Sequence, residues 1–275
     1  MSNIDIKTVA GFGDQWTRFS QESVPEAELR RLFNEYFEVF PWENLPANAT
    51  GFDLGSGSGR WARFVAERVG KLHCIDANAD ALEVARRNLR GAVNCEFHHA
   101  SVDQIPLPDN SVDFGYSLGV LHHVPNTQNG ITDCVRKLKP GAPFLLYLYY
   151  RFDNRRVWFQ MLWRVSDVVR QVVSRMPNAL RYSLSQVIAA FVYWPLARLA
   201  LALEKIDVSV QHLPLSHYKN LSFYSMRTDA LDRFGTRLEQ RFTKKEIQAM
   251  MENAGLENIR FRNGPPYWCA AGIKK

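Results

Sequence analysis

Short runs of strand-forming residues alternate with helical patterns between residues 50 and 150, and this alternation constrains the fold more than any other feature. Strands that alternate with helices at this spacing form a parallel sheet with right-handed crossovers. The sequence therefore predicts an α/β, doubly wound fold with helices on both faces of the sheet. The expected strands are 50–54, 72–75, 94–98, 112–117 and 143–149, with helices at 24–40, 58–69, 79–90 and 131–138.

The alternation stops near residue 151, where a long, helical, aromatic-rich stretch begins, and it returns at residue 243. A helix at 244–253, closed by Gly255, and two strands at 258–263 and 267–273 are expected there. We therefore expect three parts: an N-terminal lid or strap with a helix (1–49), a Rossmann-like core (50–150 and 241–275) and a helical insertion between strand 5 and the last helix (151–240).

A glycine-rich string, GFDLGSGSG at 51–59, places three glycines directly after the first expected strand and before a helix. Glycines at 55, 57 and 59 allow the backbone to turn tightly and to approach a ligand without a Cβ atom in the way. Asp76 ends the second strand 21 residues after Gly55, where a carboxylate can accept hydrogen bonds from both ribose hydroxyls of an adenosine cofactor. Together, the loop and Asp76 predict a nucleoside site.

The spacing of the glycines separates classes of nucleotide-binding protein. A dinucleotide fingerprint has the form GxGxxG, whereas this string is GxGxG, and a triphosphate loop of the form GxxxxGK[ST] does not occur in the sequence. Dinucleotide oxidoreductases and nucleoside triphosphatases are therefore disfavoured.

Three segments resemble the successive motifs of class I S-adenosylmethionine-dependent methyltransferases, in particular the small-molecule, type 11-like domains: DLGSGSG at 53–59, Asp76, and SVDFGYSLGVLHHV at 111–124. The resemblance covers about 50–150 and resumes at 243–275. It implies a Rossmann-like, seven-stranded sheet whose last strand is antiparallel. It also implies S-adenosyl-L-methionine as cofactor, bound across the carboxyl ends of the strands, and S-adenosyl-L-homocysteine as product.

The resemblance also implies residue roles. Asp53 and the glycine loop would hold the methionine end of the cofactor, Asp76 the ribose, and Leu118 with Gly119 would border the sulfonium. Ser101 occupies the position at which many relatives carry an acidic residue that reads adenine, so this role would pass to the Val102 backbone and Asp103. The full expected set is Trp16, Asp53, Gly55, Ser56, Gly57, Gly59, Asp76, Ala77, Ser101, Val102, Asp103 and Leu118.

His122 and His123 follow the fourth strand, where a methyl acceptor is expected. Methyl transfer to a hydroxyl or a protonated amine requires removal of a proton, and a histidine suits that task. We therefore consider both as catalytic candidates. The alternative is that they only pack or bind backbone groups. For the string FGDQWTRF at 12–19, which shows no helical or strand period, a lid over the cofactor and a strap on the sheet edge both stay open.

The insertion contains two apolar stretches. In the first, apolar residues from Val157 to Val172 recur at helical spacing beside several arginines. The second, 187–203, is close to membrane-spanning length, but Pro195 and Arg198 interrupt it and argue against a span. A lid over the acceptor, a subunit interface and an interfacial lipid-binding helix are the alternatives. Residues 213–236 are interpreted as a loop with groups that could grip a polar substrate, or as a surface loop with ion pairs.

Charge and cysteine content limit the classes of partner that the protein can have and the cellular compartment in which it is expected. The net charge is +6, and residues 151–275 carry 20 Lys and Arg against 10 Asp and Glu. This basic half could attract an anionic substrate, a membrane surface or nucleic acid. The four cysteines lack zinc-ligand spacing, so no metal site is expected. Because the N-terminus lacks the pattern of a secretory signal, a cytoplasmic location is expected.

We interpret the sequence as that of an S-adenosylmethionine-dependent methyltransferase that acts on oxygen or nitrogen of a small molecule, such as a sugar, a lipid-linked or an aromatic metabolite. One alternative is an RNA or protein methyltransferase, although nucleic acid is a disfavoured partner. Another is a cofactor-binding module without catalysis that acts as a partner or membrane-surface protein. Peripheral membrane or lipid contact through 151–205 and a homodimer are further expectations.

Overall fold

The computed structural model describes residues 2–210 and 212–275, which divide into two compact units. The core unit contains the residues up to Glu22, Leu29–Arg151 and Leu238–Lys275. The helical unit contains Ser23–Glu28 and Phe152–Arg237.

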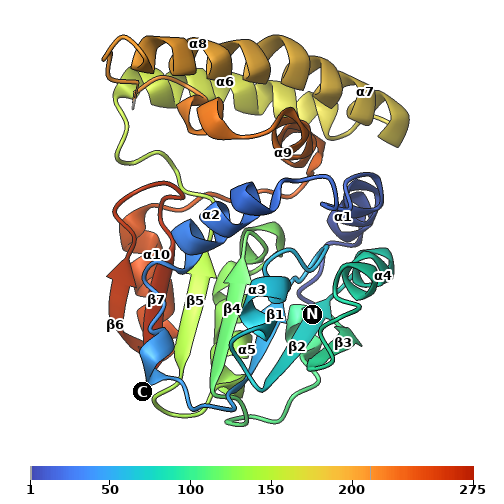
Figure 1. The fold of residues 1–275 in the computed structure, drawn as a ribbon, viewed down its shortest axis with the longest axis vertical. Helices are drawn as coiled ribbons and strands as arrows, with labels where there is room; N and C mark the ends of the chain where they lie inside the picture. Colours follow the sequence, from blue (N-terminus) through green and yellow to red (C-terminus); the bar gives the residue numbers. More distant parts are fainter. Residues whose placement is uncertain (1, 211) are drawn as a thin grey trace. The chain divides into compact units, whose positions relative to one another are not determined.

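The core unit is built on a seven-stranded sheet with strand order β3-β2-β1-β4-β5-β7-β6 (Figure 1). Strands β1 to β5 are parallel, and β7 is antiparallel to both of its neighbours, β5 and β6. The predicted doubly wound α/β fold with an antiparallel last strand is therefore confirmed. The strands are β1 (Thr50–Leu54), β2 (Lys71–Asp76), β3 (Cys95–His99), β4 (Phe114–Leu118), β5 (Pro143–Tyr147), β6 (Leu256–Phe261) and β7 (Ala270–Lys274).

Helices cover the sheet because the central strands are apolar on both faces. On one face, α5 (Thr127–Lys137) and α10 (Lys244–Asn253) enclose a core that includes Phe52, Ile75 and Phe144. On the other face, α4 (Ala79–Asn88) places Arg86 over Phe97 of β3. The remaining elements of this unit are α1 (Ile6–Arg18), most of α2 (Glu26–Phe37), α3 (Ala62–Ala66) and the 3₁₀ turns η1 (Trp42–Asn44), η2 (Val102–Gln104) and η3 (Leu121–His123).

Two expectations about the first half of the chain are corrected. Residues 12–18 are helical in α1, where the Asp5 side chain caps the helix by accepting from the Thr8 amide. The string at 12–19 contains only the last seven residues of the 13-residue helix, which begins at Ile6, so its period could not be recognised from the string alone. The helix expected at 58–69 is only α3, since the glycine-rich turn extends to residue 61 before helical geometry begins.

The helical unit packs its helices around α9 (Phe223–Gly235), with a small core that includes Tyr193, Met226 and Phe234. Residues 178–204 form one continuous helical run, in which α7 (Asn178–Ile188) passes through a π-helical segment, η4 (Ala189–Tyr193), into α8 (Trp194–Glu204). Pro195 therefore does not interrupt the helix. It lies at the first turn of α8, next to a π segment that accommodates the missing N–H. The other helix is α6 (Val157–Val173).

The expectation of a long loop at 213–236 is wrong. This segment contains the 3₁₀ turn η5 (Ser216–Asn220) and then α9, which begins at a serine cap, Ser222. The polar residues between 223 and 235 were misinterpreted as loop because they alternate with the apolar residues that face the core of the helical unit.

Candidate cofactor site

The carboxyl ends of β1, β2 and β4 lie next to one another in the sheet, because β1 pairs with both other strands in parallel register. Asp53, Asp76 and Leu118 therefore reach one edge. In open α/β sheets, ligands bind outside the carboxyl ends of the strands.

The loop after β1 depends on glycines with left-handed backbone conformations. Gly55, Gly57 and Gly59 have φ values of 76°, 54° and 76°. A Cβ atom on Gly55 would lie 2.3 Å from the Val120 side chain, so this position cannot carry a larger residue without movement. The loop thus exposes backbone rather than side chains at the strand edge, as a close-fitting nucleoside site requires.

Asp76 is held by two backbone amides. Gly57 N donates to Oδ2 at 2.9 Å, and Asn78 N donates to Oδ1 at 2.8 Å. Burial raises the pKa of this carboxyl, whereas these two amides lower it. Each carboxylate oxygen can accept a further hydrogen bond, so the side chain is fixed in place and retains acceptor capacity for two hydroxyls.

Asp53 is a buried carboxyl with unused hydrogen-bonding capacity. Its Oδ2 atom has no hydrogen-bond partner among the described residues, and the same holds for the hydroxyls of Ser56 and Ser58. Burial raises the pKa of Asp53 to about 8, while the neighbouring Tyr116 hydroxyl acts in the opposite direction. Buried polar groups without partners are rare in folded proteins, so this cluster fits a polar ligand with a cationic group.

Trp16 lies on α1 against the glycine loop. A Cβ atom on Gly57 would be 3.0 Å from its indole ring. The side-chain amide of Asn78 donates to Val9 O on the same helix at 3.1 Å, which fixes α1 beside the loop. The geometry thus brings Trp16, Gly57 and Asp76 together, and an aromatic wall for a bound nucleoside stays a prediction.

The loop after β3 places Ser101, Val102 and Asp103 in and before η2. The carboxylate of Asp103 accepts from the Ser101 hydroxyl at 2.6 Å and from the Asn3 amide at 3.1 Å. Burial works to raise its pKa, but these bonds lower it overall. Val102 is buried in the core. The Asp103 carboxylate already binds the N-terminal segment. We therefore expect the backbone of Val102, rather than this carboxylate, to recognise adenine. Ala77 is partly exposed, and its carbonyl faces His99 Nε2 at 3.0 Å.

Leu118 ends β4, and Gly119 follows with a φ of 78°. A Cβ atom built on Gly119 would meet no atom within 4 Å. Open space therefore exists at the carboxyl end of β4, where the resemblance places the sulfonium.

His122 is fully buried, and its ring stacks on Tyr149 with centroids 3.9 Å apart. Both ring nitrogens lack hydrogen-bond partners among the described residues. Burial, with the neighbouring His123 and Arg241, holds its pKa well below the usual value. His122 is therefore neutral at pH 7, and its unused donor and acceptor make it either a ligand contact or a source of instability.

His123 has a defined tautomer. Its Nδ1 lies 2.7 Å from Leu238 O, and because a carbonyl only accepts, Nδ1 carries the proton and donates. The lone pair is then on Nε2. A ring fixed in this way can take up a proton at Nε2, so His123 is better prepared than His122 to act as a base.

Sequence reasoning missed a group from the two later segments of the core unit. Arg241 lies over the Tyr149 ring at 5.0 Å and pairs with Glu239 at 2.8 Å, and Gln240 N donates to His122 O. These residues are close to the histidines although they are distant in the sequence: Tyr149 follows His123 by 26 residues, and Arg241 follows His122 by 119 residues. Only the aromatic run around Tyr149 gave any signal in the sequence.

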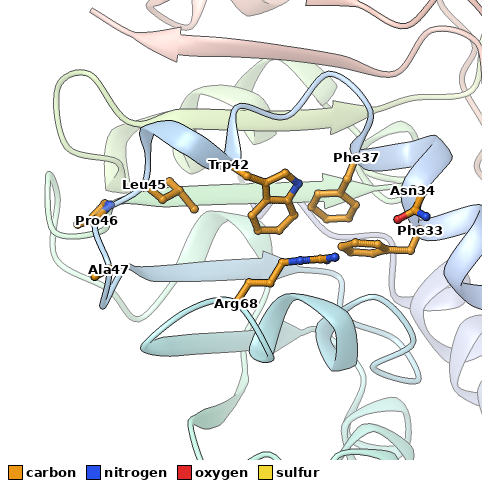
Figure 2. Close-up of a pocket in the computed structure, with 8 residues that line it drawn as sticks. All are labelled: Phe33, Asn34, Phe37, Trp42, Leu45, Pro46, Ala47 and Arg68. Carbon is orange, nitrogen blue, oxygen red and sulfur yellow. The ribbon is translucent and has the colours of Figure 1, made fainter.

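An open cavity of about 610 Å³ lies elsewhere in the core unit (Figure 2). It is located before β1, between the end of α2 and Arg68, and thus at the opposite end of the strands from the glycine loop. Its walls are mainly Phe33, Phe37 and Trp42, and the Arg68 guanidinium lies over Phe33 and Trp42. This cavity is therefore separate from the candidate cofactor site.

A Rossmann-like sheet with a glycine loop and a fixed carboxylate after β2 defines a nucleoside-cofactor protein. Residues 52–146 match a protein family described as "Methyltransferase domain". This region is thus a methyltransferase domain of the class I, S-adenosylmethionine-dependent type, and the resemblance noted in the sequence is confirmed.

Individual relatives are distant. The chain is 30% identical over 103 residues to phosphoethanolamine N-methyltransferase 2 of Caenorhabditis elegans, which covers 36% of this chain and 24% of that protein. It is 26% identical over 128 residues to demethylmenaquinone methyltransferase of Bacillus licheniformis, covering 40% and 55%. The chain thus spans between a quarter and about half the length of these relatives. A solved structure of a possible exported protein from Bordetella parapertussis shares the fold, with a TM-score of 0.50 at 14% identity, covering 92% and 70%.

Proposed function

We propose that the protein transfers a methyl group from S-adenosyl-L-methionine to oxygen or nitrogen of a small molecule. The observation that carries this proposal is the loop geometry: Gly57 has no side chain, faces Trp16 and fixes Asp76 through its amide. The names of the two relatives support a small-molecule acceptor, although they describe chemically different acceptors.

The chain's own residues would bind the cofactor, orient the acceptor and remove a proton from the acceptor. The cofactor would supply an electrophilic methyl group on a sulfonium. Asp76 would accept from the ribose hydroxyls, and Asp53 would face the cationic methionine end. His123, with Nδ1 donating to Leu238 O and its lone pair on Nε2, would accept the proton of the acceptor, and the space beside Gly119 would receive the reacting groups.

Calorimetric titration with S-adenosylmethionine, S-adenosylhomocysteine and NAD tests the cofactor. Binding of S-adenosylmethionine and S-adenosylhomocysteine, but not of NAD, supports the proposal. Binding of NAD, or binding of none of the three compounds, contradicts it. Transfer of a tritiated methyl group to small molecules, RNA and protein separates the acceptor classes. Tight cofactor binding without transfer to any acceptor would favour a non-catalytic module.

We further propose that the helical unit lies on an anionic membrane surface. The supporting observation is the inverted amphipathicity of α6. Two of its three ionic residues point inward: Arg170 is buried and pairs with Asp167 at 2.7 Å. Its exposed side is apolar, and consists of Val157, Trp158, Met161, Leu162, Val165, Val168, Val169 and Val172. Soluble helices show the reverse order.

The helical run 178–204 repeats this arrangement. Its inward stripe has small or polar residues at four-residue spacing, including Arg181, Ser185, Ala189, Tyr193 and Ala197. Its exposed stripe is apolar and includes Leu180, Leu184, Val187, Phe191 and Trp194. Protein surfaces normally expose single, scattered apolar residues, whereas this unit exposes two continuous apolar faces.

Charge favours an anionic lipid surface over an apolar protein partner. The exposed arginines Arg156, Arg164 and Arg175 lie on or beside α6. Asp167, which is partly buried and paired, is the acidic residue of this helix. Apolar side chains flanked by arginines are typical of helices that bind in the headgroup region.

The run 178–204 has 27 residues and could cross a membrane by length and composition alone. A peripheral arrangement explains the structure better, because the inward stripe packs against α9, whose Asp229, Asp232 and Arg233 would otherwise enter the hydrocarbon. The sequence argument against a span from Pro195 fails, since the helix continues through it. A cytoplasmic location stays a prediction.

Vesicle co-sedimentation of the full chain tests the surface. We expect binding to vesicles that contain phosphatidylglycerol and weaker binding to phosphatidylcholine alone. The double variant Met161→Glu, Val168→Glu should reduce the bound fraction at least about tenfold, because each buried side chain contributes about 1.5–3 kcal/mol. Val93→Glu is the matched control, since Val93 is 99% exposed in the core unit. Equal loss in the control, or a concentration-dependent dimer that ignores vesicles, would contradict the proposal.

A further inference from the structure

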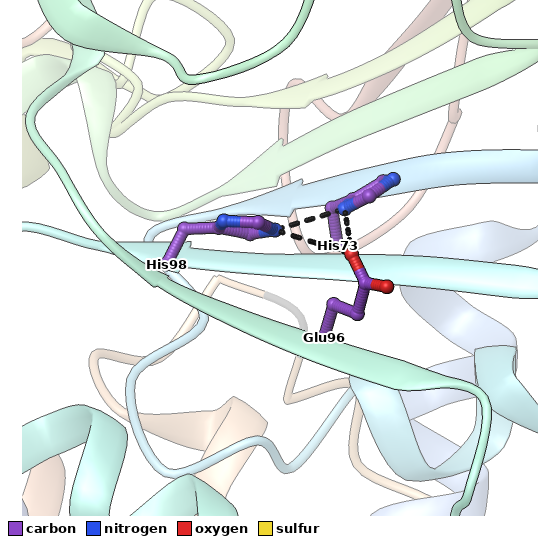
Figure 3. A group of neighbouring side chains, drawn as sticks. All are labelled: His73, Glu96 and His98. Carbon is purple, nitrogen blue, oxygen red and sulfur yellow. Dashed lines mark hydrogen bonds and ion pairs between the residues drawn. The ribbon is translucent and has the colours of Figure 1, made fainter.

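Two histidines and a glutamate meet on one face of the sheet edge formed by β2 and β3 (Figure 3). His73 lies opposite Glu96 in the parallel register, and His98 follows Glu96 by two residues, so all three side chains share a face. His73 is 7% exposed, His98 is partly exposed, and Glu96 opens to solvent. The cluster is independent of the proposed methyl-transfer function.

The donor atoms lie at the separations that one metal ion requires. His73 Nδ1 and His98 Nε2 are 2.9 Å apart, and Glu96 Oε2 lies 3.4 Å from the first and 3.9 Å from the second. In a tetrahedral site with bonds of about 2.0–2.1 Å, neighbouring donors are about 3.3 Å apart. The three measured separations lie on either side of this value, so small side-chain rotations are enough to form the site.

Two cations lie near the cluster, Lys71 and Arg86. Burial lowers the pKa of both His73 and His98, and Lys71 lowers them further. Arg86 acts in the same direction on His98, and Glu96 acts in the opposite direction on both.

Lys71 fixes the carboxylate without blocking it. Its Nζ lies 2.7 Å from Oε1 of Glu96, while Oε2 faces the histidines. The contact from Lys71 to Oε1 is of the kind that orients metal-binding carboxylates without occupying the oxygen that binds the metal. The same contact lowers the pKa of Glu96 and keeps it ionised.

We propose that His73, His98 and Glu96 bind a first-row divalent cation, with Zn²⁺ as the preferred ion and water in the fourth position. Two imidazoles and a carboxylate favour zinc over magnesium or calcium, which take oxygen ligands. In the metal-free protein, one proton lies between the facing nitrogens. On binding, that proton moves to the remote nitrogen of its own ring, and both facing lone pairs point to the metal.

The site would connect β3, the edge strand of the sheet, to β2 through side chains. Ions that bind only the folded state stabilise it. The expected consequence is therefore a metal-dependent increase in thermal stability rather than a change in chemistry.

Titration of tag-free, full-length protein with CoCl₂ and ZnCl₂ tests the site. We expect visible absorption bands typical of four-coordinate Co²⁺, displacement of Co²⁺ by Zn²⁺, and a higher melting temperature with either ion. His98→Ala and Glu96→Gln should each weaken binding by more than the roughly 10–100-fold that loss of an outer contact costs. Lys71→Met should keep the bands at weaker affinity, because Lys71 orients the carboxylate but is not a ligand.

His99→Ala is the matched control, because His99 lies on the same strand with its side chain on the other face, next to the Ala77 carbonyl. Its Co²⁺ affinity should equal that of the wild type. Binding that persists unchanged in His98→Ala, that falls equally in His99→Ala, or that is absent from the wild type at micromolar metal would overturn the proposal. Methyl transfer is not part of this measurement, so failure here leaves the proposed function unaffected.

Discussion

The amide of Gly57 donates to Oδ2 of Asp76 at 2.9 Å, and this bond joins the glycine loop to the end of β2. The carboxylate is thus oriented before any ligand arrives. Replacing it should affect cofactor affinity directly.

Asp76→Ala should weaken S-adenosylmethionine binding by about 1.5–3 kcal/mol, the range for hydrogen bonds to a charged group. Calorimetric titration measures this change. Asp80→Ala, in the first turn of α4, is the control and should bind as the wild type does. Unchanged affinity in Asp76→Ala would place the ribose elsewhere.

Gly57→Ala should reduce cofactor affinity about tenfold, because a left-handed φ of 54° costs an alanine about 1–2 kcal/mol and its Cβ would contact Trp16. Adding Trp16→Ala removes the contact but also the predicted aromatic wall, so the double variant should bind no better than Gly57→Ala. The same titration serves for both. Gly91→Ala, where a Cβ meets nothing within 4 Å, should have no effect.

Cofactor binding should release a proton through Asp53. With a pKa of about 8, this carboxyl is mostly protonated at pH 7 in the free protein, and it would ionise beside the cationic end of the cofactor. Affinity should therefore rise as pH increases toward 8. Calorimetry in buffers of different ionisation enthalpy should detect about one proton per cofactor. Asp53→Asn should release none, and an equal release from that variant would refute the assignment.

His122 should make the protein less stable in mild acid. Its folded pKa lies well below the unfolded value, so the unfolded chain binds the proton first as pH falls below about 6.5. The free energy of unfolding should then fall by about 1.4 kcal/mol per pH unit from this group. Urea unfolding at pH 7.5 and 5.5 should show a smaller pH dependence in His122→Phe than in the wild type. An exposed control, His212→Phe, should retain the wild-type dependence.

Asp167 should stabilise the helical unit through its contacts to two largely buried arginines, Arg170 and Arg233. Asp167→Ala leaves Arg170 buried without its carboxylate and should cost about 3–5 kcal/mol. By contrast, Glu204→Ala breaks a pair with Lys219 in which the glutamate is half exposed, and should cost less than about 1 kcal/mol. Guanidinium unfolding measures the free energy of unfolding of both variants. Equal losses in the two variants would contradict this ranking.

The sheet and the position of the glycine loop, Asp53 and Asp76 at its carboxyl edge were predictable because their signals are local. Each parallel strand is a short apolar run, and the glycines with Asp53 and Asp76 lie within 24 residues of one another. The resemblance could therefore be recognised before any three-dimensional information.

The surroundings of the histidines were not predictable, because they come from distant segments. Tyr149 stacks on His122, and Arg241 reaches the same cluster only after the chain has passed through the whole helical unit. A local pattern cannot show which of two adjacent histidines has its Nδ1 fixed by the carbonyl of Leu238.

The orientation of α6 was also beyond sequence analysis. Its periodicity indicates an apolar face but not the direction in which that face points. The direction depends on Asp167, which neutralises Arg170 inside the unit and so allows the polar side to be the buried one.

The chain crosses between the two units four times, at 22/23, 28/29, 151/152 and 237/238, and the last two crossings are attached to the core unit at one place. Tyr150 and Phe242 form a parallel bridge, and Phe242 N and Arg151 N donate across it to Tyr149 O and Phe242 O. These backbone hydrogen bonds join residues of the core unit on either side of the 86 residues from Phe152 to Arg237. We expect such a junction to accept a different cap in place of Phe152–Arg237, while the glycine loop and Asp76 of the core unit keep their places.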